Sequence, residues 1–413
     1  MARRPIHSFF PIVAFERRRF TMRRLCPSLS RPGDQLSALC PLPAKYKILK
    51  VIGEGGYGMV VKCLDKGSKE VVAIKVGADQ ACMANEAMVL NMLMECRLDT
   101  SNIVKFYGAF NDNKYMVFEK LDINLQQHLF KRKGPVSLQE VRTIIQQLAS
   151  GLNTLKEVGV IHTDVKPNNI MLVDRKKEPL KVKLIDFGLA VVTPQAEAKH
   201  ITQVLYYRCP EVIFGLPCSE AIDMWSLGCV MARMILGCEL FPGCSDHELL
   251  RYMYDILGPP PDQVMHIGKK TTKYCKRTTD HWFLKTIEDY FGKEDEVTEK
   301  RQYSFRSLDE LKSLYKKEYI KAEAEEWHAC IDLLMAMLNW DDEERISPAE
   351  VLIHPFITMN YGDISQGGSS TFSALRQLRG KKKKARKILF ITAPVKTFSI
   401  TAAVRERRRK RQT

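Results

Sequence analysis

The sequence predicts an α+β protein made of two lobes, a small antiparallel sheet followed by a larger and mainly helical part. Short β-type runs dominate residues 46–118, where one stretch, residues 82–96, has helical spacing of its apolar side chains. From Leu125 onward the apolar residues recur mainly at helical spacing. The length of 413 residues exceeds what one small core needs and suits two or three domains.

The individual elements follow the same patterns along the chain. The β-type runs cover residues 46–53, 59–64, 70–76 and 115–118, and the clearest helical patterns cover residues 141–155, 225–236 and 331–338. Residues 259–325 form a polar, charge-mixed insertion without a chemical motif. We therefore expect a small sheet lobe joined, from Leu125 onward, to a larger helical lobe.

The net charge of +16 is concentrated at the two ends of the chain. Residues 1–44 hold eight arginines and two acidic residues, and residues 376–413 hold fifteen lysines and arginines and one acidic residue. The two ends carry a combined charge of +20, so the residues between them carry a net charge of −4 and are mildly acidic. The folded part is therefore not expected to bind nucleic acid through a general basic surface.

The basic ends read as disordered segments. Residues 1–44 form an arginine-rich arm, although serine, arginine and few acids are also typical of a mitochondrial transit peptide. Residues 358–413 form a linker and a polybasic tail, in which residues 381–387 and 407–411 resemble nuclear import signals. The alternatives are a solvated charge run and electrostatic contact with nucleic acid or an anionic membrane.

The cysteines and apolar segments favour a soluble intracellular protein. The twelve cysteines are scattered, form no CxxC pair and follow no cleavable signal peptide, which favours a reducing compartment. The apolar run at residues 388–404 is interrupted by Pro394 and Lys396 and falls short of a membrane span. We therefore expect no contact with the membrane interior.

Three closely spaced glycines, Gly53, Gly55 and Gly58, lie between two predicted strands. Residues without a Cβ atom let backbone N–H groups approach phosphate oxygens closely. A dinucleotide-binding fold requires a helix after such glycines, whereas a strand follows here. The pattern predicts a phosphate-binding hairpin, with a glycine-rich turn of no chemical role as the alternative.

Lys75 lies in an otherwise apolar strand pattern, VAIK. A lysine in such a position needs an anionic partner to offset its burial. We expect phosphate oxygens and the carboxylate of Glu86, on the predicted helix, to be these partners. A surface ion pair is the alternative.

Three further motifs follow in the helical part: residues 162–169 (HTDVKPNN), residues 186–188 (DFG) and residues 209–211 (CPE). With the glycines and Lys75, they resemble in order and spacing the signature set of eukaryotic protein kinases. This resemblance implies a bilobal protein-kinase fold over residues 45–357, with helix C in a first lobe at 45–118, a hinge at 119–122 and a second lobe at 123–357. It also implies binding of ATP and Mg²⁺, and transfer of the terminal phosphoryl group of ATP to protein hydroxyls.

The resemblance also assigns roles to single residues. Asp164 accepts the proton of the incoming hydroxyl, Lys166 offsets negative charge on the phosphate, and Lys75 anchors the phosphates. Asp186 and Asn169 supply the hard oxygen ligands that Mg²⁺ prefers. The nucleotide-binding residues implied by the resemblance are Ile52, Gly53, Gly55, Gly58, Val60, Ala73, Lys75, Glu86, Phe118 as the bulky gatekeeper, Glu119, Leu121 and Asn169.

Two further residue sets resemble structural features of kinases. Glu211 and Arg345 resemble a buried ion pair that ties the activation segment, residues 186–211, to the late helices. Removal of one partner of such a pair costs about 3 to 5 kcal/mol. Asp223 resembles the helix residue that anchors the backbone of the catalytic loop.

Residues 206–211, residues 215–225 and the insertion after Gly258 resemble the CMGC group, and within it homeodomain-interacting protein kinases. Residues 269–274 and 303–305 of the insertion support this placement. The resemblance implies phosphorylation of Ser/Thr, commonly before proline, and Arg208 matches the arginine that shapes the pocket for that preference. It further implies transcription factors or co-regulators as substrates, a nuclear and also cytoplasmic location, and a monomer; dual specificity stays open.

Four departures from the kinase pattern bear on activity. Only eleven residues separate Lys75 from Glu86, fewer than is usual, so helix C must start late or follow a shortened loop. Thr163 stands where many kinases have the arginine that reads a phosphorylated activation loop, and Ile201 stands where close relatives have an autophosphorylated tyrosine. Cys209 replaces the alanine of the Ala-Pro-Glu motif, a change we expect to be tolerated. A pseudokinase or scaffold that keeps the fold is therefore the alternative function.

Overall fold

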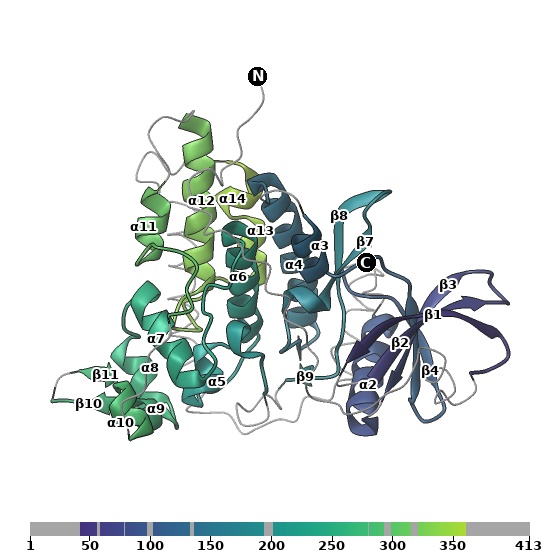
Figure 1. The fold of residues 1–413 in the computed structure, drawn as a ribbon, viewed down its shortest axis with the longest axis horizontal. Helices are drawn as coiled ribbons and strands as arrows, with labels where there is room; N and C mark the ends of the chain where they lie inside the picture. Colours follow the sequence, from purple (N-terminus) through teal and green to yellow (C-terminus); the bar gives the residue numbers. More distant parts are fainter. Residues whose placement is uncertain are drawn as a thin grey trace, which may run out of the picture.

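The computed structural model describes residues 42–360, apart from residues 56–57, 78, 97–101, 133–135, 194–200, 280, 293–298 and 315–320. Our expectations for the basic arm, the linker and the basic tail fall almost entirely on residues outside this part. The described chain forms two lobes, a strand-rich one at the right of Figure 1 and a helical one at the left. This arrangement confirms the predicted α+β class with a small sheet lobe and a larger helical lobe.

The small lobe is built on an antiparallel sheet of five strands in the order β1-β2-β3-β5-β4. Its elements are β1 (Tyr46–Gly55), β2 (Gly58–Asp65), β3 (Val71–Gly77), α2 (Gln80–Glu95), β4 (Phe106–Phe110) and β5 (Tyr115–Glu119). The sequence patterns predicted all of these except β4. That strand has only five residues, and a register shift between Phe106 and Gly108 interrupts its alternation.

Alternation along the strands gives the sheet two different faces. On one face, side chains such as Val72 and Ile74 form a small separate core. On the other face, Ala73 and Met116 join the main core, which also contains the buried side chains of α2. Lys75 lies two residues after Ala73 and directly opposite Met116, so it shares this second face and points toward α2.

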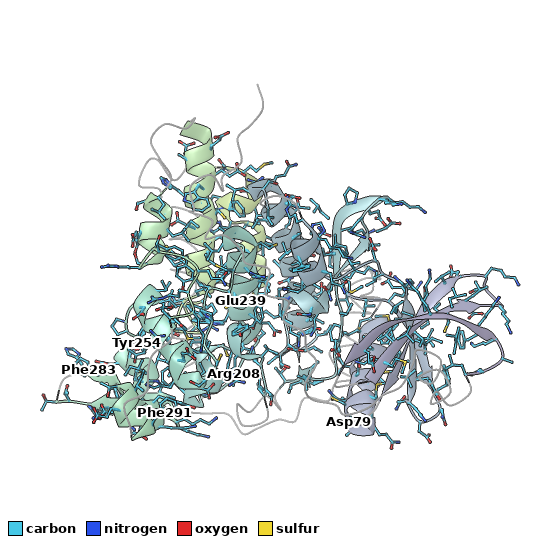
Figure 2. The ribbon with its side chains drawn as sticks, viewed as in Figure 1. Asp79, Arg208, Glu239, Tyr254, Phe283 and Phe291 are labelled. Carbon is cyan, nitrogen blue, oxygen red and sulfur yellow. The ribbon has the colours of Figure 1, made fainter. Side chains whose placement is uncertain are left out.

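A very short connection joins β3 to α2. The Asp79 side chain accepts hydrogen bonds from the backbone N–H groups of Ala81 and Cys82 and caps the helix at the lower end of α2 in Figure 2. A Cβ atom on Gly77 would lie 2.1 Å from Met83 Cγ. The missing side chain of Gly77 therefore lets the first turn of α2 approach β3 closely, so the shortened loop is the one of our two expectations that the structure adopts.

The large lobe is mainly helical, and α4 and α12 both pack against α6 (Figure 1). Its longer helices are α4 (Leu138–Glu157), α6 (Ala221–Leu236), α7 (Asp246–Leu257) and α12 (Lys321–Met337). Its shorter helices are α3 (Leu125–Lys131), η3 (Pro167–Asn169), η5 (Leu205–Tyr207), α5 (Pro210–Phe214), α13 (Pro348–Leu352) and α14 (Pro355–Thr358). Thirteen of the sixteen residues of α6 are buried, as expected for a helix in the middle of a core.

Two short strand pairs position the loops between the lobes. They are β6 (Val160–Ile161) with β9 (Val191–Val192), and β7 (Ile170–Asp174) with β8 (Glu178–Leu184). Ile170 pairs with Leu184, and the Ile185 N–H group donates to the Asn169 carbonyl at 3.0 Å. This pairing brings Asn169 at the start of β7 beside Asp186 just after β8.

The described part of residues 259–325 folds as an appendage of the large lobe. It contains α8 (Asp262–Ile267), α9 (Thr271–Tyr274), the hairpin of β10 (Cys275–Arg277) and β11 (Trp282–Leu284), α10 (Ile287–Phe291) and α11 (Leu308–Ser313). Within the described residues, no helix has the length and apolar character that a membrane crossing requires.

Candidate active site

Lys75 joins two carboxylates at the boundary between the lobes. Its Nζ atom lies 2.7 Å from Glu86 Oε2 and 2.9 Å from Asp186 Oδ1. The side chain of Glu86 is 2% exposed, whereas that of Asp186 is 27% exposed. The ion pair that we expected between β3 and helix C, which is α2, is therefore formed, and the same lysine contacts Asp186 of the DFG motif.

The protonation states of these three groups follow from burial and proximity. Burial lowers the pKa of Lys75, but the carboxylates of Glu86 and Asp186 outweigh it and raise the pKa above its usual range. Burial raises the pKa of Asp186, and Lys75 more than reverses this, so the pKa of that carboxyl is lowered. Burial dominates at Glu86, whose pKa is raised although Lys75 acts in the opposite direction. Lys75 is thus held as a cation.

The catalytic loop brings three of the predicted residues together. Asp164 Oδ2 accepts hydrogen bonds from Lys166 Nζ at 2.6 Å and from Asn169 Nδ2 at 2.8 Å. Asn169 Nδ2 also donates to the Asp164 carbonyl at 2.9 Å. Both contacts to the Asp164 side chain involve Oδ2, which leaves Oδ1 as the oxygen that can face an incoming hydroxyl.

Asp223 on α6 fixes the start of this loop. Its carboxylate accepts the backbone N–H groups of His162 at 2.7 Å and Thr163 at 2.8 Å. Complete burial raises the pKa of Asp223 to about 6, although His162 and the two N–H groups act to lower it. Asp223 therefore occupies the anchoring position that the sequence assigned to it.

The DFG motif is held in one defined arrangement. Asp186 adopts a φ of 66°, in the left-handed region, and Phe187 is fully buried against the His162 ring at 4.8 Å between centroids. The Phe187 N–H group donates to Glu86 Oε1 at 3.3 Å. The rare backbone conformation of Asp186 turns its side chain toward Lys75 while Phe187 enters the core.

One cavity contains the charged groups on which the kinase interpretation depends. Lys75, Glu86, Asp164 and Asp186 all line it. Asn169 adjoins the cavity through its hydrogen bonds to Asp164. The structure therefore brings the predicted lysine, proton acceptor and metal-binding side chains to a single place.

Most of the predicted nucleotide-binding residues of the small lobe lie on its sheet. The β1–β2 hairpin carries Gly53, Gly55 and Gly58, and a Cβ atom on Gly58 would lie 2.1 Å from the Val76 carbonyl oxygen. Gly58 adopts a φ of 130°, which only glycine tolerates easily. The apolar members of the predicted set, from partly exposed to buried, are Ile52, Val60, Ala73, Phe118 and Leu121.

The hinge residue Glu119 makes contacts that the sequence did not indicate. Its side chain accepts the Lys105 N–H group at 2.6 Å and Lys183 Nζ at 2.5 Å, and its own N–H group donates to the Lys105 carbonyl at 3.1 Å. The side chain of Glu119 therefore ties the hinge to β8 and to the residues before β4. Only its carbonyl group remains a candidate for adenine recognition.

The side-chain oxygens fit a magnesium ion. Because both hydrogen bonds of Asn169 use its amide nitrogen, the amide oxygen Oδ1 is turned away from Asp164. Asp186 contacts Lys75 through Oδ1, which leaves Oδ2 for a cation. Mg²⁺ is usually held by one or two carboxylates together with substrate phosphates, so this set of hard oxygens is sufficient.

Comparison with known proteins supplies the family. The family described as "Protein kinase domain" matches residues 46–357. The chain belongs to the protein kinase family. Among similar proteins, homeodomain-interacting protein kinase 2 of Mesocricetus auratus is 39% identical over 344 residues, covering 79% of this chain and 30% of the relative.

Two further relatives are also homeodomain-interacting protein kinases. Homeodomain-interacting protein kinase 1 of Mus musculus is 38% identical over 79% of this chain and 28% of its own length. Homeodomain-interacting protein kinase 4 of Mus musculus is 34% identical over 76% of this chain and 55% of its own length. The kinase thus spans less than a third to about half of these relatives, and the expected resemblance of its kinase domain to homeodomain-interacting protein kinases is confirmed.

The activation segment of this kinase is anchored by residues that the sequence reading did not single out. Gln203 is buried, donates to Ser226 Oγ at 3.1 Å and accepts the Cys209 N–H group at 2.9 Å. Ile201 is also buried and joins the main core, whereas Lys199 and His200 lie outside the described residues. A polar residue two positions after Ile201 gave no pattern from which this network could be recognised.

Asn85 is the second residue that sequence reasoning missed. Its amide nitrogen donates to the carbonyls of Gly188 and Ala190, more than 100 residues along the kinase chain. Its position directly before Glu86 was the one available signal, because the same turn of α2 must face the DFG motif.

Proposed function

We propose that this chain is an active protein serine/threonine kinase that uses ATP and Mg²⁺. The observation that carries the proposal is the shared cavity of Lys75, Asp164 and Asp186, together with the formed ion pair between Lys75 and Glu86. Phosphoryl transfer depends on positioning and charge neutralisation more than on covalent chemistry by the protein. The cavity holds the groups that supply both.

Each charged group has a role that its contacts support. Lys75, held as a cation by Glu86, anchors ATP phosphates, and Asp186 with Asn169 would hold Mg²⁺. Mg²⁺ when bound neutralises charge on the phosphates. Asp164 accepts the proton of the substrate hydroxyl, and Lys166 at 2.6 Å from it offsets charge on the transferred phosphoryl group.

We also propose that the substrates carry proline after the phosphorylated Ser or Thr. Arg208 Nη2 and Nε donate to the Gln203 carbonyl at 2.6 and 3.1 Å, and Arg208 Nη1 pairs with Asp246 at 2.5 Å. The Gln203 carbonyl is thereby occupied, and a residue without an N–H group, such as proline, loses nothing beside it. Arg208 lies in the helical lobe, well away from Asp79 of the small lobe (Figure 2).

The names of the relatives suggest where the kinase acts. Because those proteins are named for interaction with homeodomains, we propose transcription factors or co-regulators as substrates and the nucleus as the main location, with a cytoplasmic pool. The basic residues at 381–387 and 407–411 support import. Deletion of residues 380–413 from a fluorescent fusion tests this: nuclear exclusion supports it, and unchanged location contradicts it.

A kinase assay tests the proposed activity. The full-length chain would be incubated with radiolabelled ATP, Mg²⁺ and a library of Ser-Pro and Thr-Pro peptides. We expect Asp164→Asn to abolish phosphate transfer and to keep nucleotide binding, and Asp186→Ala to lose both transfer and the Mg²⁺ dependence of binding. Asp112→Asn, in the turn between β4 and β5, is the matched control and should behave as the wild type. Equal labelling by the wild type and Asp186→Ala would favour the scaffold alternative.

A further inference from the structure

Three consecutive carbonyl groups after the DFG phenylalanine are held by side chains from two other elements. Asn85 Nδ2, on α2, donates to the Gly188 carbonyl at 3.1 Å and to the Ala190 carbonyl at 3.0 Å. Thr163 Oγ1, in the catalytic loop, donates to the Leu189 carbonyl at 2.7 Å. Both N–H bonds of one amide and one hydroxyl are therefore used on residues 188–190.

Helix α2 also holds the other side of the same backbone. Glu86, next to Asn85, accepts the Phe187 N–H group through Oε1 and pairs with Lys75 through Oε2. One turn of α2 thus binds the N–H group of Phe187 and, just after it, the carbonyl groups of Gly188 and Ala190. Asp186 is therefore held directly by its ion pair with Lys75 and indirectly by the contacts of the residues that follow it.

Thr163 is itself held in an unusual conformation. It is a buried β-branched residue with a φ of 65°, which is rare for such residues. Its N–H group is bound by Asp223, and its hydroxyl reaches Leu189. Such a conformation persists only where the surroundings determine it, so the hydroxyl is presented to the activation segment in a fixed direction.

The chain beyond residue 190 continues this ordered path. Val191 and Val192 pair with β6, and the Thr193 N–H group donates to the Gly159 carbonyl at 2.8 Å. Further on, Ile201 is buried in the core and has no hydroxyl that could be phosphorylated. Before residues 194–200, residues 188–193 are thus held by the neutral side chains of Asn85 and Thr163 and by backbone groups, and after them Ile201 packs in the core.

We propose that Asn85 and Thr163 are positioning residues that clamp residues 188–190 and so hold Asp186 in its metal-binding orientation without phosphorylation of the activation segment. This inference rests on the proposed kinase function. The clamp replaces charge attraction by three neutral hydrogen bonds, of which the two from Asn85 join α2 of the small lobe to the large lobe. It acts through Asp186, and neither residue needs to touch ATP.

The test compares near-isosteric variants in the full-length chain. Asn85→Leu removes both N–H donors and Thr163→Val removes the hydroxyl, whereas Thr163→Ser keeps it. We expect the first two to lower kcat and to raise the Mg²⁺ concentration for half-maximal activity by about 10- to 100-fold, as for residues that orient metal ligands. Thr163→Ser should restore both quantities, and the double variant should lose less than the product of the single losses because the two residues hold one segment. Asn91→Leu, at an exposed position of the same helix, is the control and should match the wild type.

Two measurements separate this inference from the proposed activity. Mg²⁺-dependent binding of a fluorescent ATP analogue reports the orientation of Asp186 without turnover, so it tests the clamp even if the wild type transfers no phosphate. Treatment with a phosphatase that removes phosphate from Ser, Thr and Tyr should leave the wild-type Mg²⁺ dependence unchanged. The proposal would be overturned if both Asn85→Leu and Thr163→Val kept the Mg²⁺ dependence of the wild type. It would also be overturned if phosphatase treatment changed the Mg²⁺ dependence of the wild type.

Discussion

Arg345 and Glu211 form a doubly bonded ion pair that is closed to solvent. Arg345 Nη1 and Nη2 lie 2.5 and 3.1 Å from the two carboxylate oxygens of Glu211, and the two side chains are 0% and 1% exposed. Arg345 also donates to the carbonyls of Ala221 and Asn339. The pair therefore joins the end of the activation segment to the start of α6 and to the residues after α12.

Loss of one partner of this pair should destabilise the fold strongly. Arg345→Met leaves the Glu211 carboxylate buried without its cation, and we expect the free energy of unfolding to fall by about 3 to 5 kcal/mol. Urea unfolding followed by tryptophan fluorescence measures the change. Lys181→Met, which breaks the exposed pair with Glu178, is the control and should cost less than about 1 kcal/mol. Equal losses in the two variants would contradict the structural role.

Gly77 should be needed for the position of α2. In Gly77→Ala the new methyl group would lie 2.1 Å from Met83 Cγ, and because Met83 is buried in the core, we expect the first turn of α2 to shift away from β3 with it. We expect a loss of about 1 to 3 kcal/mol of stability and a larger loss of kcat, because Glu86 moves with the helix away from Lys75.

The double variant Gly77→Ala with Met83→Ala should recover much of the lost kcat, since it removes the colliding side chain. Gly67→Ala, where the nearest atom is an exposed Asp65 oxygen at 3.2 Å, is the control. A similar kcat for Gly77→Ala and Gly67→Ala would show that the short connection tolerates a side chain.

Lys75→Met should abolish phosphoryl transfer while the fold persists. The substitution removes the cation that holds Asp186 and leaves two carboxylates, Glu86 and Asp186, near each other. We expect kcat to fall by more than about 100-fold, as for other groups that stabilise developing charge. Lys75→Arg should not restore it, because a planar guanidinium cannot replace a compact ammonium between two carboxylates. Steady-state kinetics of the three proteins decide the point, and kcat within tenfold of the wild type in Lys75→Met would exclude the anchoring role.

The sequence predicted the parts of this kinase that depend on local pattern. The apolar VAIK run predicted a strand that carries Lys75 and its need for an anionic partner, and the order of the motifs placed Asp164 and Asp186 in one site. Side-chain contacts between residues far apart in the chain could not be predicted from the sequence. The two bonds of Asn85 to Gly188 and Ala190 require α2 to lie close to the DFG motif, and they join residues more than 100 positions apart.

The same distinction explains the hinge. The resemblance to kinases placed Phe118 as the gatekeeper at the end of a β-type run and Glu119 at the start of the hinge. The partner of the Glu119 side chain, Lys183, belongs to β8, and a lysine on a polar strand carries no sign of its partner. Which charged side chains pair depends on how distant elements pack together, and the periodicity of apolar residues in the sequence does not predict this packing.

His354 should make the stability of the kinase depend on pH. Its side chain is buried and accepts the Phe356 N–H group through Nδ1 at 3.2 Å, at the N-terminus of α14. Burial lowers the pKa of His354 from 6.5 to about 4. The unfolded chain therefore takes up a proton as the pH falls below about 6.5, whereas the folded chain stays neutral until about pH 4. The stabilisation is complete above the unfolded pKa and is lost as the pH falls toward the folded pKa.

From these two pKa values we expect His354 to account for a loss of about 2 kcal/mol in the free energy of unfolding between about pH 8 and pH 5. Carboxylates titrate over the lower part of this range as well, so the measured quantity is the difference between the wild type and His354→Asn. Asparagine keeps an acceptor for the Phe356 N–H group but takes up no proton. His281→Asn, at a side chain that is 72% exposed, should leave the pH dependence of the wild type unchanged. If His354→Asn lost as much stability at pH 5 as the wild type, the burial of a neutral imidazole at the start of α14 would not be the source of the acid sensitivity.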